Sequence, residues 1–183
     1  MTEITNYRID FVERTKEILQ ENYPEFKDNN REVTFLLNCL LGLIITVSEN
    51  EKKLNKVFKG NIDNDFLKFI PEKIGFVEKT NNIDLTDKDL TIFELAVCHK
   101  TSLIKETKLW FVNKIRNCIA HQNIEGMNEN GKWIGVRLWN QKDSTKDFEI
   151  IFTVEEIKNL AIELATQYLK FHKINSEIRK LDY

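Results

Sequence analysis

Proline and glycine are scarce in this chain, which has two prolines and six glycines among 183 residues. A many-stranded barrel needs a turn every few residues, and these two residue types supply many of those turns. The scarcity therefore favours helices. A chain of this length can bury one sizeable core, so we expect residues 1–183 to form a single domain.

Cysteine is also scarce, and no pattern for a metal or a disulfide is visible. Cys39, Cys98 and Cys118 are odd in number and lack C-x-x-C spacing, which argues against a zinc knuckle and a disulfide scaffold. The acidic residues between 63 and 89 lack the spacing of an EF-hand calcium loop. We therefore expect no metal, no cofactor and a cytoplasmic location.

Long apolar runs and an excess of positive charge are absent as well. The N-terminal residues mix charged and apolar types, unlike a secretion signal. The most apolar run, residues 35–47, is shorter than the roughly 20 residues that span a bilayer, so no membrane partner is expected. The net charge of −2 argues against a protein that holds nucleic acid mainly through a broad basic surface. Any RNA contact has to be local.

Helical periodicity dominates the N-terminal part. A first surface helix carries one apolar stripe and ends at Pro24. A second helix, from a cap at Asn29 or Asn30 to about Val47, is apolar on nearly all sides. We expect this second helix to lie at the centre of the fold.

The middle of the chain is more polar. We expect a short polar helix over residues 50–58, and then a loop over 60–85 with at most one helical turn. Thr86 and Asp89 resemble a capping box, which predicts a further helix. Its apolar residues are Leu90, Phe93 and Val97.

A hairpin is predicted in the C-terminal third. Asn130 and Gly131 mark a turn, and residues 133–139 (W-I-G-V-R-L-W) alternate as a strand does. Residues 148–152 give the second strand. We expect this small antiparallel hairpin to occupy about 132–152.

Thr153 and Glu156 then form a complete capping box for the last helix. The apolar stripe of this helix consists of Ile157, Leu160, Ala161, Leu164, Tyr168 and Phe171. The predicted fold is therefore mainly all-α, a helical bundle with a small β-hairpin before its last helix.

The helix predicted from Lys105 to about His121 divides into two faces when its residues are placed 100° apart. The apolar face contains Val112, Ile115, Cys118 and Ile119. The other face, here called the polar stripe, contains Asn113, Arg116, Asn117, Ala120 and His121. Arg116 and His121 lie at its two edges, about 140° apart. This shape suits a shallow groove with polar walls.

The side chains of the polar stripe suit phosphodiester chemistry. An imidazole can move a proton to or from a ribose 2′-hydroxyl or a leaving oxygen, which is the role expected of His121. Arg116 can stabilise charge that develops on the phosphate. Asn117 and Asn113 can orient the phosphate or the imidazole by hydrogen bonding. None of these roles requires a metal.

R-N-C-I-A-H at residues 116–121 resembles the signature of the HEPN superfamily (higher eukaryotes and prokaryotes nucleotide-binding). That signature is Arg, four to six residues, then His, often with a polar residue directly after Arg. The apolar second helix and the capped last helix also fit such a compact bundle, so the resemblance covers most of the chain.

This resemblance implies a metal-independent endoribonuclease that acts as a homodimer, frequently as a toxin or phage-defence effector. Arg116 and His121 would be its catalytic pair and Asn117 its supporting polar residue. Toxin members paired with a nucleotidyltransferase antitoxin typically have Tyr two residues after the His. Position 123 is Asn here, so that mode of regulation is not implied, while another antitoxin partner stays open.

A homodimer through the motif helix is also expected from the chemistry. Attack by a 2′-hydroxyl benefits from a base and an acid, whereas one chain supplies a single motif. A two-fold axis would bring two motifs into one cleft. Ala120 is small, and Leu109 and Trp110 are apolar, which would permit close helix contact.

Lys114, Trp133 and Trp139 are candidate RNA contacts, and the two tryptophans, on one face of the predicted strand, could stack bases. Packing in a core or an interface is the alternative role for them. The polar stripe itself could be an ordinary solvated helix end. A non-catalytic RNA or nucleotide binder, a dimeric adaptor and a structural interaction module therefore stay open as functions.

Overall fold

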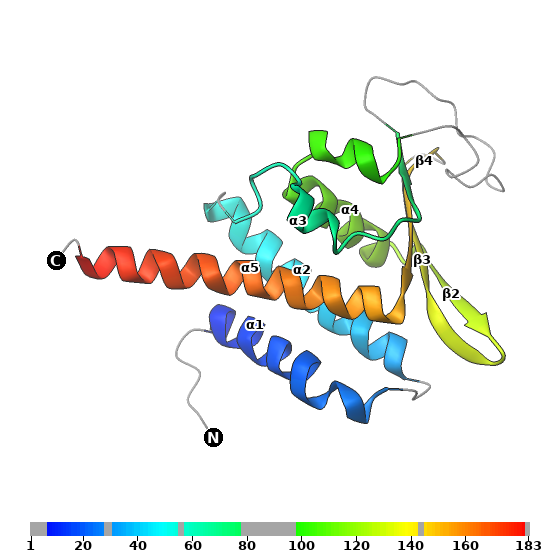
Figure 1. Ribbon diagram of the computed structural model, residues 1–183, viewed down its shortest axis with the longest axis horizontal. Helices are drawn as coiled ribbons and strands as arrows, with labels where there is room; N and C mark the ends of the chain where they lie inside the picture. Colours follow the sequence, from blue (N-terminus) through cyan, green and yellow to red (C-terminus); the bar gives the residue numbers. More distant parts are fainter. Residues whose placement is uncertain (1–6, 28–30, 55–56, 78–97, 143–144, 182–183) are drawn as a thin grey trace.

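A computed structural model describes the backbone of residues 7–27, 31–54, 57–77, 98–142 and 145–181 (Figure 1). The principal elements are α1 (Tyr7–Glu17), α2 (Glu32–Leu54), α3 (Asn64–Leu67), β1 (Ile74–Phe76), η4 (Lys100–Lys105), α4 (Lys108–Ala120), β2 (Ile124–Glu129), β3 (Lys132–Lys142), β4 (Thr145–Thr153) and α5 (Val154–Leu181). After α1 the chain continues through a π-helical turn, η1 (Ile18–Asn22), and a 3-10 turn, η2 (Tyr23–Glu25). The prediction that this helix stops at Pro24 was wrong in detail: α1 ends at Glu17, and the helical turns that follow it continue through Pro24 to Glu25.

The strands form one four-stranded antiparallel sheet in the order β1-β4-β3-β2. The predicted pairing of two strands before the last helix is confirmed as β3 with β4. The prediction of a hairpin alone was wrong, because β1 and β2 extend the sheet on both sides. Helices still form the greater part of the described chain, so the fold is mixed but mainly helical.

The turn between β2 and β3 is the one predicted at Asn130 and Gly131. Both residues have positive φ, 51° and 77°. Such a two-residue turn matches the right-handed twist of antiparallel strands, and glycine adopts this conformation at little cost. The turn was visible in the sequence, whereas the strand before it was not, because Ile-Glu-Gly-Met-Asn-Glu hardly alternates.

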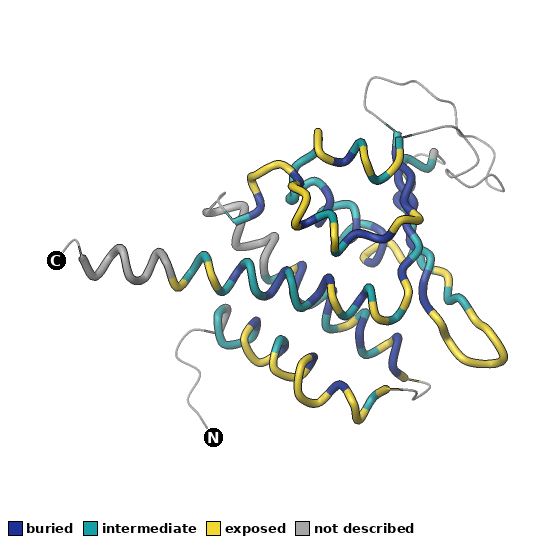
Figure 2. The backbone as a smooth tube through the Cα atoms, viewed as in Figure 1, coloured by how far each residue is buried: buried dark blue, intermediate teal, exposed yellow. Residues whose placement is uncertain are grey.

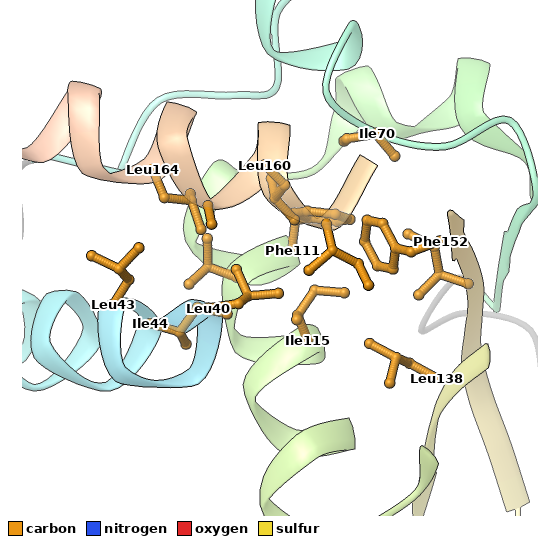
Figure 3. Packing of buried hydrophobic residues seen from close by; sticks show 14 of the residues in the cluster. Leu40, Leu43, Ile44, Ile70, Phe111, Ile115, Leu138, Phe152, Leu160 and Leu164 are labelled. Atoms are coloured by element: carbon orange, nitrogen blue, oxygen red, sulfur yellow. The ribbon is translucent and has the colours of Figure 1, made fainter. Parts of the chain in front are cut away.

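The core lies where the helices meet the sheet. Helix α5 contacts α1 and α2, and α4 contacts both α2 and β3 (Figure 1). The centre is filled by Leu40 and Ile44 of α2, Phe111 and Ile115 of α4, Leu160 of α5 and Leu138 of β3 (Figure 3). Buried residues line the inner sides of these elements, while the tip of the β2–β3 hairpin is exposed (Figure 2).

Two predicted helix boundaries change. Helix α2 runs on to Leu54, so the separate helix predicted over 50–58 was wrong. No proline or glycine follows Gly42 in this stretch to stop the helix. The motif helix α4 starts later than Lys105, because Thr107 caps it by accepting a hydrogen bond from the backbone N–H of Trp110 at 3.1 Å.

Other local predictions are confirmed or fall outside the described residues. One helical turn does occur within 60–85, as α3, although strand β1 was missed there. Thr153 and Glu156 form the capping box: the Thr153 N–H donates to Glu156 Oε2 at 2.8 Å, and the Glu156 N–H donates to Thr153 Oγ1 at 3.3 Å. The caps at Asn29 or Asn30 and the helix from Thr86 lie outside the described residues.

Candidate active-site helix

Helix α4 separates into the two predicted faces. Its buried residues are Phe111, Val112, Ile115, Cys118 and Ile119. In the polar stripe, Asn113, Arg116 and Asn117 are half-buried, and Ala120 and His121 are exposed. The helical period alone therefore separated the buried residues of this helix from its more accessible ones.

The C-terminal end of α4 is closed by a Schellman motif. The Asn123 N–H donates to the Cys118 carbonyl at 2.9 Å, and the Gln122 N–H donates to the Ile119 carbonyl at 3.1 Å. Gln122 has a φ of 57° at the position where glycine is usual. The Asn123 carbonyl in turn accepts from the Trp139 N–H of β3 at 3.2 Å.

This cap determines where His121 lies. His121 is the C-cap residue, directly after the last helical residue Ala120, and its N–H donates to the Asn117 carbonyl at 3.0 Å. Because the next residues turn back and bond to β3, the helix end is fixed against the sheet. The imidazole is thus carried by a backbone that is hydrogen-bonded at the helix end and next to the sheet, while His121 itself is exposed.

Lys114, a predicted RNA contact, takes part in a polar cluster between α4 and the sheet. Its ammonium pairs with Asp147 at 2.5 Å, and the Asn140 amide donates to the same carboxylate at 2.6 Å. The ammonium also lies 5.6 Å from the centre of the Trp110 ring. Much of the charge of Lys114 is therefore engaged within the protein.

A β-bulge places Asp147 in this cluster. Asn140 pairs with Phe148 and Gln141 with Lys146, so Asp147 is an extra residue in β4. The alternation of the strand did not reveal this irregularity, and sequence reasoning missed both Asp147 and Asn140.

Burial, and then the nearby Asp147 charge, raise the pKa of the Cys118 thiol far above its usual range, which keeps this cysteine neutral.

Trp110 serves the core rather than an open surface. Its ring centre lies 5.3 Å from that of Phe76 and 5.9 Å from that of Phe148. Leu109 likewise packs against the buried cluster. Of the three residues expected to permit close helix contact in a dimer, Ala120 is the exposed one.

Trp139 lies on the face of the sheet that points away from α4. The Arg137 guanidinium is 5.8 Å and the Lys146 ammonium 5.5 Å from the centre of its ring. Arg137 also pairs with the fully buried Glu149 and, at 3.1 Å, with Glu125. Trp139 is thus half-buried beside a network of charges.

Trp133 lies on the other face, so the expectation that the two tryptophans share one face was wrong. Met127 pairs with Gly135 and Asn128 with Trp133, which leaves Ile134 as an extra residue in β3. This bulge reverses the alternation before it. Trp133 accordingly contacts Gly126, whose cross-strand partner is the buried Val136.

Two hollows of the protein lie apart from the polar stripe. One of about 330 Å³ is lined by Met127, Ile134 and Ile151, among others, and one of about 460 Å³ by residues that include Lys108 and Glu163. Neither is lined by a residue of the polar stripe.

Within the described residues, no group of three or more His, Cys, Asp or Glu side chains could hold a metal ion.

Comparison with known proteins identifies the family. A profile of the family described as HEPN pEK499 p136 matches residues 1–175. No curated protein and no solved structure matches the chain. In the part of the chain that is described, no helix is long and apolar enough to cross a membrane. Because the matched region covers nearly all of the sequence, this chain belongs to the HEPN family.

Proposed function

We propose that this HEPN protein is a metal-independent endoribonuclease of the cytoplasm that acts in a toxin–antitoxin or phage-defence system. The observation that carries the proposal is the polar stripe of α4. It combines the half-buried Arg116 and Asn117 with the exposed His121, and it ends at a cap that is bonded to the sheet.

In this proposal His121 is the general acid or base. A ribose 2′-hydroxyl loses its proton to an imidazole and attacks the adjacent phosphorus, while the bond from phosphorus to the 5′-oxygen breaks. The leaving 5′-oxygen takes a proton from a second imidazole. Arg116 stabilises the charge on the phosphate oxygens, and Asn117 and Asn113 orient the phosphate by hydrogen bonds. The products are a 2′,3′-cyclic phosphate and a 5′-hydroxyl.

The second imidazole comes from a second copy of the chain. HEPN membership supports a dimer, and a two-fold axis along the polar stripe would join two motifs. The exposed Ala120, lying between the edges of the stripe, leaves room for such an approach. Of the candidate RNA contacts, Trp133 is the most accessible, whereas Lys114 and Trp139 have charged neighbours within the protein.

The experiment is a cleavage assay with purified protein, EDTA and a structured RNA. His121→Ala should lose most activity, since general acid or base catalysis contributes about 100- to 10,000-fold. His99→Ala is the matched control, because His99 is also exposed but belongs to another element, as the residue before η4, and is not part of the polar stripe. If His121→Ala cleaves as well as the parent, the mechanism is wrong.

A non-catalytic RNA binder or dimeric adaptor is the second candidate. It is favoured by the exposure of Ala120 and His121 in the single chain, since catalytic groups usually line a cleft. RNA binding without turnover under every condition, together with unchanged binding in His121→Ala, would favour this function over a ribonuclease.

A further inference from the structure

Trp133 is an exposed indole that lies flat on the backbone. Three atoms of its six-membered ring, Cη2, Cζ3 and Cζ2, lie 3.0, 3.1 and 3.2 Å from the point that a β-carbon on Gly126 would occupy. Distances this similar place the point over the face of the ring, not at its edge. Only a glycine at 126 permits this contact without displacement of the ring.

The other ring face is accessible to solvent. Trp133 is 45% exposed, although one of its faces is covered by the β2 backbone. The ring is therefore supported by backbone on one face and presents an apolar, polarisable surface to solvent on the other. Aromatic rings of this kind are the surfaces on which unpaired nucleobases stack.

The bulge at Ile134 places this ring on the same side of the sheet as the motif helix. Trp110 and Phe111 of α4 pack against Phe148, which pairs with Asn140 on the Val136 side of β3. Trp133 contacts Gly126, which pairs with Val136 itself. Without the bulge the indole would point to the opposite face, where Arg137 and Trp139 lie.

The indole of Trp133 is also within reach of an RNA strand bound at the polar stripe. Strand β2 begins three residues after His121, and Asn128, the cross-strand partner of Trp133, is four residues further along. At about 3.4 Å per residue, these four residues span about 14 Å. Asn128 is exposed beside the ring, and its carboxamide can donate to or accept from a base edge.

We infer that Trp133 is the stacking platform for an unpaired base of single-stranded RNA whose backbone continues to the polar stripe of α4. This inference rests on the proposed function for its ligand. It adds a built base-binding position outside the motif, formed by the indole of Trp133, the bare backbone of Gly126 and the amide of Asn128.

The test measures binding by fluorescence anisotropy of a labelled single-stranded 2′-O-methyl oligouridylate or oligoadenylate, which cannot be cut by 2′-hydroxyl attack. Trp133→Ala should weaken binding by about 5- to 100-fold, the range that base stacking on an aromatic ring contributes. Trp133→Phe should retain most of the affinity. Gly126→Val keeps the indole but displaces it, and it should weaken binding in the same direction.

Ile134→Ala is the matched control, because Ile134 is the adjacent residue, is 41% exposed and lines the hollow beside Ile151. It should bind as the parent does. The inference would be overturned by equal losses of RNA affinity in Trp133→Ala and Ile134→Ala, by a changed oligomeric state of Trp133→Ala, or by unchanged RNA affinity in Trp133→Ala. Either of the first two results would indicate that the hairpin makes a protein contact instead. If Trp133→Ala binds RNA as tightly as the parent while His121→Ala no longer cleaves it, the stacking platform is refuted and the proposed ribonuclease function stands.

Discussion

Gln122 holds the end of the motif helix in a left-handed conformation that glutamine rarely adopts. Its φ of 57° lets the chain reverse, so that Asn123 bonds both to Cys118 and to Trp139. A glycine would adopt the same conformation without a steric cost. Glutamine at position 122 therefore lowers the stability of the fold relative to glycine.

Gln122→Gly should increase the free energy of unfolding by about 0.5–1 kcal/mol, since it removes this strain. Urea unfolding followed by circular dichroism measures the change. Gly131→Ala, at a φ of 77° in the β2–β3 turn, should shift stability by a similar amount in the opposite direction. A loss of stability in Gln122→Gly would show that the side chain contributes more than its backbone strain costs.

At the scale of the elements, α4 is attached to the sheet by two unlike contacts. Apolar packing of Phe111 against Phe148 forms the first. The second is the polar cluster of Lys114, Asp147 and Asn140, in which Asn140 is 8% exposed. Because the bulge directs Asp147 toward the helix, this carboxylate is the shared partner of both other groups.

Asp147→Ala should lower the free energy of unfolding by about 1–3 kcal/mol, because it leaves a buried amide and a largely buried ammonium without their shared acceptor. Urea unfolding of the parent and the variant measures this difference in free energy. Asp65→Ala is the control, since Asp65 forms an exposed ion pair with Lys68, and solvent screens such pairs so that their loss has little effect on stability. Equal effects of the two substitutions would contradict the role given to the bulge.

The start of α4 is tied to α3 by the ion pair of Asp63 and Lys108, at 2.7 Å. The hydrogen bond from Lys108, and then that from the Phe66 N–H, lower the pKa of the Asp63 carboxyl. A lowered folded-state pKa stabilises the protein above the unfolded value of about 3.9, and this stabilisation is lost as pH falls through the folded pKa.

Asp63→Asn keeps a capping side chain but has no charge. The parent should be the more stable protein near neutral pH, and the difference should shrink as pH falls below about 4. Urea unfolding of both proteins across this range measures the difference. A difference that stays constant with pH would show that the ionised carboxylate contributes nothing.

Regular patterns in the sequence predicted the regular parts of the fold and of the site. The capping box at Thr153 and the stripe from Asn113 to His121 follow from local hydrogen bonding and the helical period, so they could be read directly. The bulges at Ile134 and Asp147 could not, because one extra residue reverses a strand face without changing composition. That is why Trp133 was assigned to the wrong face.

At the scale of the whole molecule, the proposed site is complete only in a pair of chains. A dimer would have twice the single-chain mass of 21.7 kDa, which light scattering measures. Ala120→Arg should give a monomer that no longer cleaves RNA, because two cations would face each other across the axis, while a cation at a helix C-terminus is favourable within one chain.

The control for this substitution is Ile104→Arg, which changes an exposed residue of η4, 51% accessible, away from the polar stripe. This variant should remain dimeric and active. If Ala120→Arg is also dimeric and active, the two chains meet elsewhere or each chain acts alone.

The central claim, that the polar stripe of α4 cleaves RNA by 2′-hydroxyl attack, is tested most directly by the chemical ends of the products. RNA cut by the parent protein in EDTA is analysed by mass spectrometry, with Arg116→Ala and His121→Ala treated in parallel. We expect 2′,3′-cyclic phosphate and 5′-hydroxyl ends from the parent and almost no cleavage from either variant. Uncut RNA, or 3′-hydroxyl and 5′-phosphate ends, would contradict the account.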